Sequence, residues 1–120
     1  MNRSPHIISK VVENHTATLK MQFDETLSDF KGHFPGNPLL PGVSQIDYAI
    51  AMARQLLNVD APFAGIEALK FQQPILPNQD VELALQWHPA NQKLNFQFSS
   101  GLGTHSTGRV LLRSDASLTD

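Results

Sequence analysis

Residues 32–57 read GHFPGNPLLPG followed by VSQIDYAIAMARQLL, and this stretch decides the fold. The prolines at positions 35, 38 and 41 favour an extended, polyproline-like path and exclude a helix. From Gly42 onward, apolar residues recur at helical spacing, and no residue from 43 to 57 breaks a helix. The predicted apolar stripe consists of Val43, Ile46, Ile50, Ala53 and Leu57. The sequence therefore predicts a stiff loop that leads into one long helix, which ends at Asn58 and Pro62.

Strand patterns lie on both sides of this helix. Residues 6–12 are rich in β-branched types and residues 15–23 alternate between apolar and polar types, which predicts two strands joined by a turn. Further strands are predicted after the helix at residues 63–71 (with a mixed pattern), 81–87, 94–98 and 104–113. The side chains predicted to share the inner faces are Ala17, Leu19, Met21, Phe23, Val81, Leu83, Leu85, Trp87, Leu94, Phe96 and Phe98. This order predicts an α+β domain with a single helix on one face of an antiparallel sheet.

The composition limits the classes of function. The chain has 120 residues, of which 41% are hydrophobic and 17% charged, so one domain spanning residues 1–120 is expected. The net charge of −2, without a basic stripe or cluster, argues against binding to nucleic acid or to a membrane surface. The absence of cysteine excludes disulfides, thiolate catalysis and Cys-ligated zinc. Without a signal-like or membrane-spanning stretch, the protein is expected to be cytoplasmic.

Asp47 falls within the predicted apolar stripe of the helix. At about 100° per residue, it lies in the arc of Val43, Ile46 and Ile50. An ionised carboxylate is costly to bury, so the acid is expected to be paired, protonated or facing a cavity. The alternative is that Asp47 lies at the edge of the stripe and is solvated.

Gly42 and His33 complete a set of three chemical groups. The first N–H groups of a helix have no internal acceptor, so the N–H of Gly42 is suited to bind an oxygen that gains negative charge. Alternatively, Pro41 and Gly42 are a simple turn into a helix. His33 lies in a constrained loop, where an imidazole can take or give a proton. The remaining histidines are interpreted as solvated surface residues, without spacing that suggests a metal site: His6, His15, His88 and His105.

The whole pattern resembles a known family. Gly32-His33-Phe34-Pro35-Gly36-x-Pro38-x-x-Pro41-Gly42-Val43, with an acid at 47, closely resembles the signature of bacterial 3-hydroxyacyl-acyl carrier protein dehydratases (FabA/FabZ-like). Lys70-Phe71-x-x-Pro74-Ile75-Leu76-Pro77 resembles the second landmark of that family, and Ser106-Thr107-Gly108-Arg109 resembles its last-strand element. The resemblance covers residues 30 to 113 and implies a hot-dog fold, in which a curved antiparallel sheet wraps one long helix.

Details of residues 38–49 are most similar to the dehydratases of aryl-polyene pigment clusters (ApeI-like). Most one-domain members of the wider family have Glu where this chain has Asp47, and an aromatic residue, here Tyr48, commonly follows the acid in the aryl-polyene branch. Asn78 replaces a glycine that is usual in the second landmark. Ser44 and Gln45 are more polar than the apolar pair common in the fatty-acid enzymes, so the acyl-chain preference stays open.

The resemblance implies a reversible loss of water from a 3-hydroxyacyl thioester to give a trans-2-enoyl thioester. His33 would act as the base beside the thioester carbonyl, the N–H of Gly42 would polarise the carbonyl oxygen, and Asp47 would protonate the leaving hydroxyl. The residues implied in substrate binding are Phe34, Pro35, Gly36, Val43 and Tyr48. No metal or redox cofactor is expected, because the phosphopantetheine arm belongs to the carrier protein.

The family also implies partners. The expected partners are acyl carrier protein and a second copy of the chain, with His from one protomer and the acid from the other; a heterodimer with a related dehydratase is the alternative. Candidate landing residues for an acidic carrier are Lys70, Lys93, Arg109 and Arg113, unless these are only scattered surface charges. Two other functions stay open: a hot-dog thioesterase and a non-catalytic subunit that binds acyl carriers.

Overall fold

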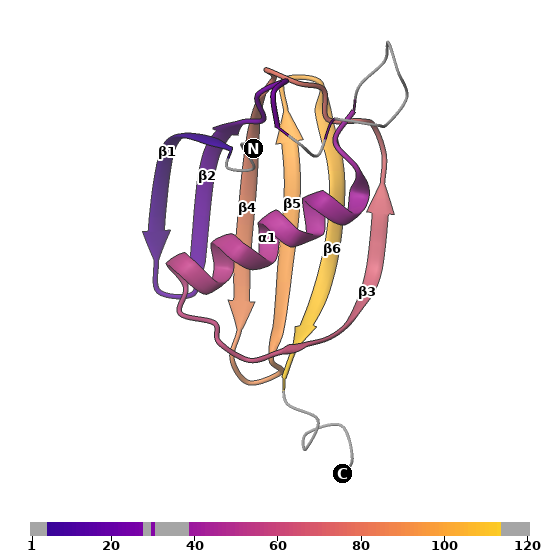
Figure 1. Cartoon of the computed structure of the whole chain (residues 1–120). Coiled ribbons are helices and arrows are strands. Elements are labelled where there is room, and N and C mark those ends of the chain that lie inside the picture. The colour runs from indigo at the N-terminus through magenta and orange to yellow at the C-terminus, as the bar shows by residue number, and fades with distance from the viewer. Residues whose placement is uncertain (1–4, 28–29, 31–38, 114–120) are drawn as a thin grey trace.

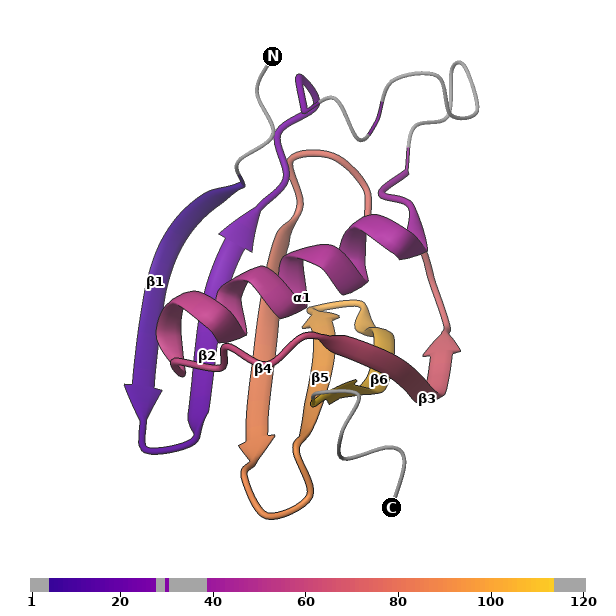
Figure 2. The same cartoon turned by 60° about the horizontal axis from the view of Figure 1, so that its bottom comes forward.

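One helix lies across one face of a six-stranded antiparallel sheet (Figure 1). The computed structural model describes residues 5–27, 30 and 39–113. The elements are β1 (His6–Glu13), β2 (Thr16–Gln22), α1 (Gly42–Leu56), β3 (Phe63–Phe71), β4 (Asp80–His88), β5 (Lys93–Ser100) and β6 (Gly103–Leu112). The strand order is β1-β2-β4-β5-β6-β3, and the sheet curves around α1 (Figure 2). This confirms the predicted α+β hot-dog class.

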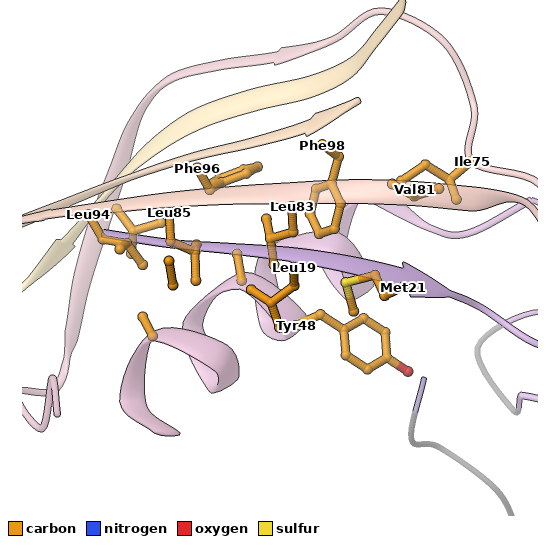
Figure 3. Close-up of a cluster of buried hydrophobic side chains, with 14 of the residues drawn as sticks. Leu19, Met21, Tyr48, Ile75, Val81, Leu83, Leu85, Leu94, Phe96 and Phe98 are labelled. Atoms are coloured by element: carbon orange, nitrogen blue, oxygen red, sulfur yellow. The ribbon is translucent and has the colours of Figure 1, made fainter. Parts of the chain in front are cut away.

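The core lies between α1 and the inner face of the sheet. The predicted alternation is confirmed, because Leu19, Leu83 and Phe98 are buried and lie opposite one another across neighbouring strands. Figure 3 shows Tyr48 of α1 beside Leu19 and Met21 of β2. Among the described residues, no helix is both long and apolar enough to cross a membrane.

Among the described asparagines, three occupy the left-handed backbone region: Asn14 (φ 41°), Asn58 (φ 56°) and Asn78 (φ 63°). Asparagine tolerates this region better than most L-residues, which explains how Asn78 can replace a glycine. The Asn78 side chain also accepts a hydrogen bond from the Glu25 N–H (3.3 Å), and its backbone N–H donates to the Phe23 carbonyl (2.7 Å). Asn58 follows Leu57, the C-cap of α1, so the helix ends where it was predicted to end.

The mixed pattern of residues 63–71 has a structural cause. β3 is a full edge strand, but its register on β6 shifts between Glu67 and Lys70, where Ala68 has φ 54°. A bulge of this kind interrupts the alternation of a strand and increases its twist. β3 therefore exposes apolar side chains along its length, namely Phe63, Leu69 and Phe71.

The buried face of α1 differs from the predicted stripe. The buried residues are Ser44, Gln45, Tyr48, Ala49 and Ala53, whereas Val43 is 72% exposed and Asp47 is exposed. The prediction that Asp47 lies on a buried stripe is therefore wrong for the single chain. That stripe follows from apolar residues alone, whereas the polar Ser44 and Gln45 of the first turn are buried, and Gln45 accepts a hydrogen bond from Ser106 of β6.

Candidate active site

The start of α1 presents backbone donors that the helix itself does not use. Pro41 precedes the helix with φ −60° and ψ 149°, and no described side chain caps the helix. The first helical hydrogen bond runs from the Gln45 N–H to the Pro41 carbonyl (3.1 Å). The N–H groups of Gly42 and Val43 therefore have no acceptor within the helix, and they lie at its partially positive end.

A pocket of about 360 Å³ lies beside these donors. It is lined by Leu39, Leu40, Gly42, Gln45, Phe71, Gln72, Gln73 and Pro74. Phe71 ends β3, and both overall views show this end of the strand next to the start of α1 (Figures 1 and 2). A Cβ atom added at Gly42 would lie 2.5 Å from Cζ of Phe71, so only glycine lets the ring approach the backbone this closely.

Two buried polar side chains fix the backbone ahead of Gly42. Gln45 accepts a hydrogen bond from the Ser106 hydroxyl (2.6 Å) and donates one to the Leu40 carbonyl (3.2 Å). The Leu40 N–H in turn donates to the Ile75 carbonyl (2.8 Å). Sequence reasoning does not predict the roles of Gln45, Ser106 and Phe71 at this site, although the unusual polarity of Ser44 and Gln45 is a visible signal.

Asp47 and Val43 lie one turn apart on the exposed side of α1. Asp47 therefore lies on the same helix as Gly42, five residues further along, and its side chain is exposed in the single chain. Tyr48 lies on the core side, where it is 6% exposed and its ring centroid lies 5.1 Å from that of Phe23. The predicted base His33 and the predicted binding residues Phe34, Pro35 and Gly36 lie outside the described residues.

His105 is a second position where the structure corrects the prediction. The sequence pattern suggests a solvated histidine, but the residue is fully buried on β6. Its Nδ1 donates to the Pro74 carbonyl (3.0 Å), because a carbonyl oxygen only accepts, and its Nε2 pairs with the Ser100 hydroxyl (2.7 Å). The imidazole thus ties β6 to the segment that forms one wall of the pocket. The strand pattern around His105 could not predict its burial, because the hydrogen-bond partner Pro74 lies 31 residues away in the sequence.

Three charged side chains of β3, β5 and β6 pair with one another. Glu67 of β3 contacts Lys93 (3.0 Å) and Arg109 (3.3 Å). Hydrogen bonds from Lys93 and then Arg109 lower the pKa of Glu67 below its ordinary value. Two of the four cations suggested for carrier docking are therefore already engaged with a carboxylate.

The helix-free face of the sheet has a larger hollow of about 590 Å³, lined mainly by outward-facing polar side chains such as Thr18, Gln97 and Thr107. It contains none of the predicted catalytic or substrate-binding residues, although Arg109, a candidate residue for carrier docking, lines it. Within the part of the chain that the structure describes, no group of three or more His, Asp or Glu side chains could hold a metal ion.

Comparison with known proteins identifies the family. Residues 9–109 match the model of the ApeI-like family, described as ApeI dehydratase. The chain belongs to the ApeI-like family. A chain of the dehydratase heterocomplex ApeI:P from Xenorhabdus doucetiae superposes with a TM-score of 0.87 and 36% identity, over 92% of this chain and 99% of that one.

The chain is also similar to 3-hydroxyacyl-[acyl-carrier-protein] dehydratases named FabZ. The 3-hydroxyacyl-[acyl-carrier-protein] dehydratase FabZ of Koribacter versatilis is 32% identical over 96 residues, which cover 71% of this chain and 58% of the relative. The chain thus matches little more than half the length of that relative. A hypothetical thioesterase of Streptococcus pneumoniae, 7% identical over 89% of this chain and 87% of that one, with a TM-score of 0.64, shares the fold alone.

Proposed function

We propose that the chain catalyses the dehydration of a 3-hydroxyacyl thioester carried on acyl carrier protein, giving the trans-2-enoyl thioester. The observation that supports this most is the start of α1, which no described side chain caps, where Gly42 lines a pocket and Asp47 follows on the same helix. The match to the ApeI-like family and to FabZ supports the same reaction class. In this proposal the chain serves aryl-polyene or fatty-acid-like synthesis.

The proposed mechanism places each group where its chemistry is needed. The Gly42 N–H, together with that of Val43, binds the thioester oxygen as enolate charge develops on it. His33 removes the proton next to the carbonyl, and Asp47 protonates the departing hydroxyl group, so that the elements of water leave without a metal or redox cofactor. Phe34, Pro35, Gly36, Val43 and Tyr48 are proposed to shape the binding site.

A second subunit completes the site in this proposal. Asp47 and the neighbouring Val43 are exposed in the single chain, although an acid catalyst works best away from bulk water. β3 lies at a sheet edge and exposes Leu69 and Phe71. A subunit that pairs along β3 would cover this apolar surface. By the family resemblance, the His33 of that subunit would act together with the Asp47 of this one.

The test is a mass-spectrometric assay of the purified chain with 3-hydroxyacyl carrier proteins of several chain lengths. The wild type is expected to remove one water, and His33→Ala and Asp47→Asn are each expected to lose turnover. His15→Ala and Asp60→Asn, which change exposed residues of the same types elsewhere, are matched controls that should stay active. Full activity of either site variant contradicts the assigned roles, and release of the free carrier thiol indicates a thioesterase instead.

A second candidate is a subunit that works only in a heteromeric dehydratase. The likeness to a chain of a dehydratase heterocomplex favours it, as does the exposed apolar surface around β3. In that case the chain alone would bind carrier protein without turnover, and dehydration would require addition of a related dehydratase subunit. Asp47→Asn in this chain would then show whether its acid serves the shared site.

A further inference from the structure

Gln45 and Ser106 are two polar residues buried in a mainly apolar core. Gln45 is 3% exposed and Ser106 is fully buried, and apart from the buried Ser44 and His105 the buried side chains of α1 and β6 are apolar, such as Ala49 and Val110. Burial of an amide or a hydroxyl is unfavourable unless each finds a hydrogen-bond partner. Their mutual hydrogen bond of 2.6 Å meets that requirement. Two apolar residues could fill the same space equally well, so packing alone does not explain why polar side chains are buried here.

A second hydrogen bond of Gln45 connects the Gln45–Ser106 pair to the segment before the helix. Its Nε2 donates to the carbonyl of Leu40 (3.2 Å), while the N–H of Leu40 donates to the Ile75 carbonyl (2.8 Å). Both backbone polar groups of Leu40 are thus held, two residues before Gly42. Since the backbone N–H of Gln45 also donates to the Pro41 carbonyl (3.1 Å), Gln45 holds the segment with its side chain and with its backbone.

We infer that Gln45 and Ser106 are positioning residues, which hold the segment from Leu40 to Gly42 so that the Gly42 N–H points at the reacting carbonyl oxygen. This inference rests on the proposed function. A displacement of about 1 Å at a reacting group costs about 100-fold in rate, so a fixed backbone is valuable here. Gln45 also lines the pocket, but both ends of its amide already bond to the protein, which favours positioning over direct contact with substrate.

Three variants test the inference: Gln45→Leu, Ser106→Ala and the double variant. Gln45→Leu is expected to lower kcat by about 10- to 100-fold, with KM changed by less than about threefold, because only the transition state uses the aligned N–H. The double variant should have a higher unfolding midpoint than Gln45→Leu alone, because it no longer buries a hydroxyl group without a partner. Its kcat should stay as low as that of Gln45→Leu.

A readout without substrate separates this inference from the proposed function. Hydrogen exchange at the N–H groups of Leu40 and Gln45 should accelerate in Gln45→Leu and in the double variant. Leu94→Ala, which destabilises the core on β5 without lining the pocket, is the control and should retain kcat at a temperature where it is folded.

The inference would be overturned if the double variant regained kcat as well as stability relative to Gln45→Leu. It would also be overturned if hydrogen exchange at the Leu40 N–H were the same in Gln45→Leu as in the wild type. If the wild type removes no water from any substrate, the proposed function fails. The exchange measurements alone then decide whether the pair holds the segment.

Discussion

The ring of Phe71 lies directly over the backbone of Gly42, so that an added Cβ would come within 2.5 Å of Cζ, 2.9 Å of Cε1 and 3.0 Å of Cε2. The two residues are 29 positions apart in the sequence but form one corner of the pocket. Phe71 is 50% exposed, so its ring is the group that would move if the glycine gained a side chain.

Gly42→Ala is therefore expected to impair turnover more than folding. The methyl group would push the Phe71 ring into the pocket, while alanine is acceptable in a helix, so the free energy of unfolding should change by less than about 1 kcal/mol. Turnover of a 3-hydroxyacyl carrier protein should fall by about 10-fold or more, because the carbonyl can no longer approach the N–H. Steady-state kinetics and urea unfolding measure the two effects. Partial recovery of turnover in Gly42→Ala with Phe71→Leu would support the steric cause, and a fully active single variant would contradict it.

Ala68→Gly is expected to stabilise the protein. Ala68 has φ 54° in the bulge of β3, a conformation that costs an L-residue about 1–2 kcal/mol and glycine almost nothing. After subtraction of the greater entropy of glycine in the unfolded chain, the gain should be about 0.5–1 kcal/mol. The matched control Ala84→Gly, on β4, should lose a similar amount in urea unfolding. Equal effects at both positions would show that the bulge is not strained.

His105→Gln is expected to destabilise the fold by about 1–3 kcal/mol. Glutamine has a terminal amide near the position of Nε2 but no donor at the position of Nδ1, so the Pro74 carbonyl loses its partner from residue 105, and the burial of an unpaired carbonyl has a cost of this size. His15→Gln, which changes an exposed histidine in the first hairpin, should alter the free energy of unfolding by less than about 0.5 kcal/mol. Thermal unfolding of both variants against wild type measures the difference, and equal midpoints would count against the buried network.

Glu67→Gln is expected to reduce stability in a pH-dependent way. Hydrogen bonds from Lys93 and Arg109 lower the pKa of Glu67 in the folded protein, so the carboxylate stabilises the fold at pH values above its unfolded pKa. That contribution is lost as the pH falls through the lowered pKa of the folded state. The difference between wild type and variant should therefore be present at pH 7, vanish in strong acid, and shrink in high salt. Chemical unfolding over a pH series measures it, and a difference that persists in acid would assign the effect to packing.

Local pattern is enough to predict most of the secondary structure. The alternation of Leu83 and Leu85 places them on the buried face of β4, and the helical spacing after Gly42 places α1, because both periods depend only on neighbours along the chain. The motif around Gly42 also points to the family, because its glycines, prolines and acid have a fixed spacing along the chain.

The rotation of α1 about its axis is decided by tertiary contacts. A stripe drawn from apolar residues alone predicts that Val43 and Asp47 face the core, but both are exposed. Gln45 is buried instead, because it forms a hydrogen bond with Ser106, which is 61 residues away. His105 is buried for the same reason, through Pro74 and Ser100. A polar side chain enters a core only where a partner from a distant segment satisfies its hydrogen bonds, and a sequence pattern holds no information on which segments will meet. The sequence by itself thus determined the elements and the position of the helix start, and the assembled sheet decided which side chains bond to the segment that leads into it.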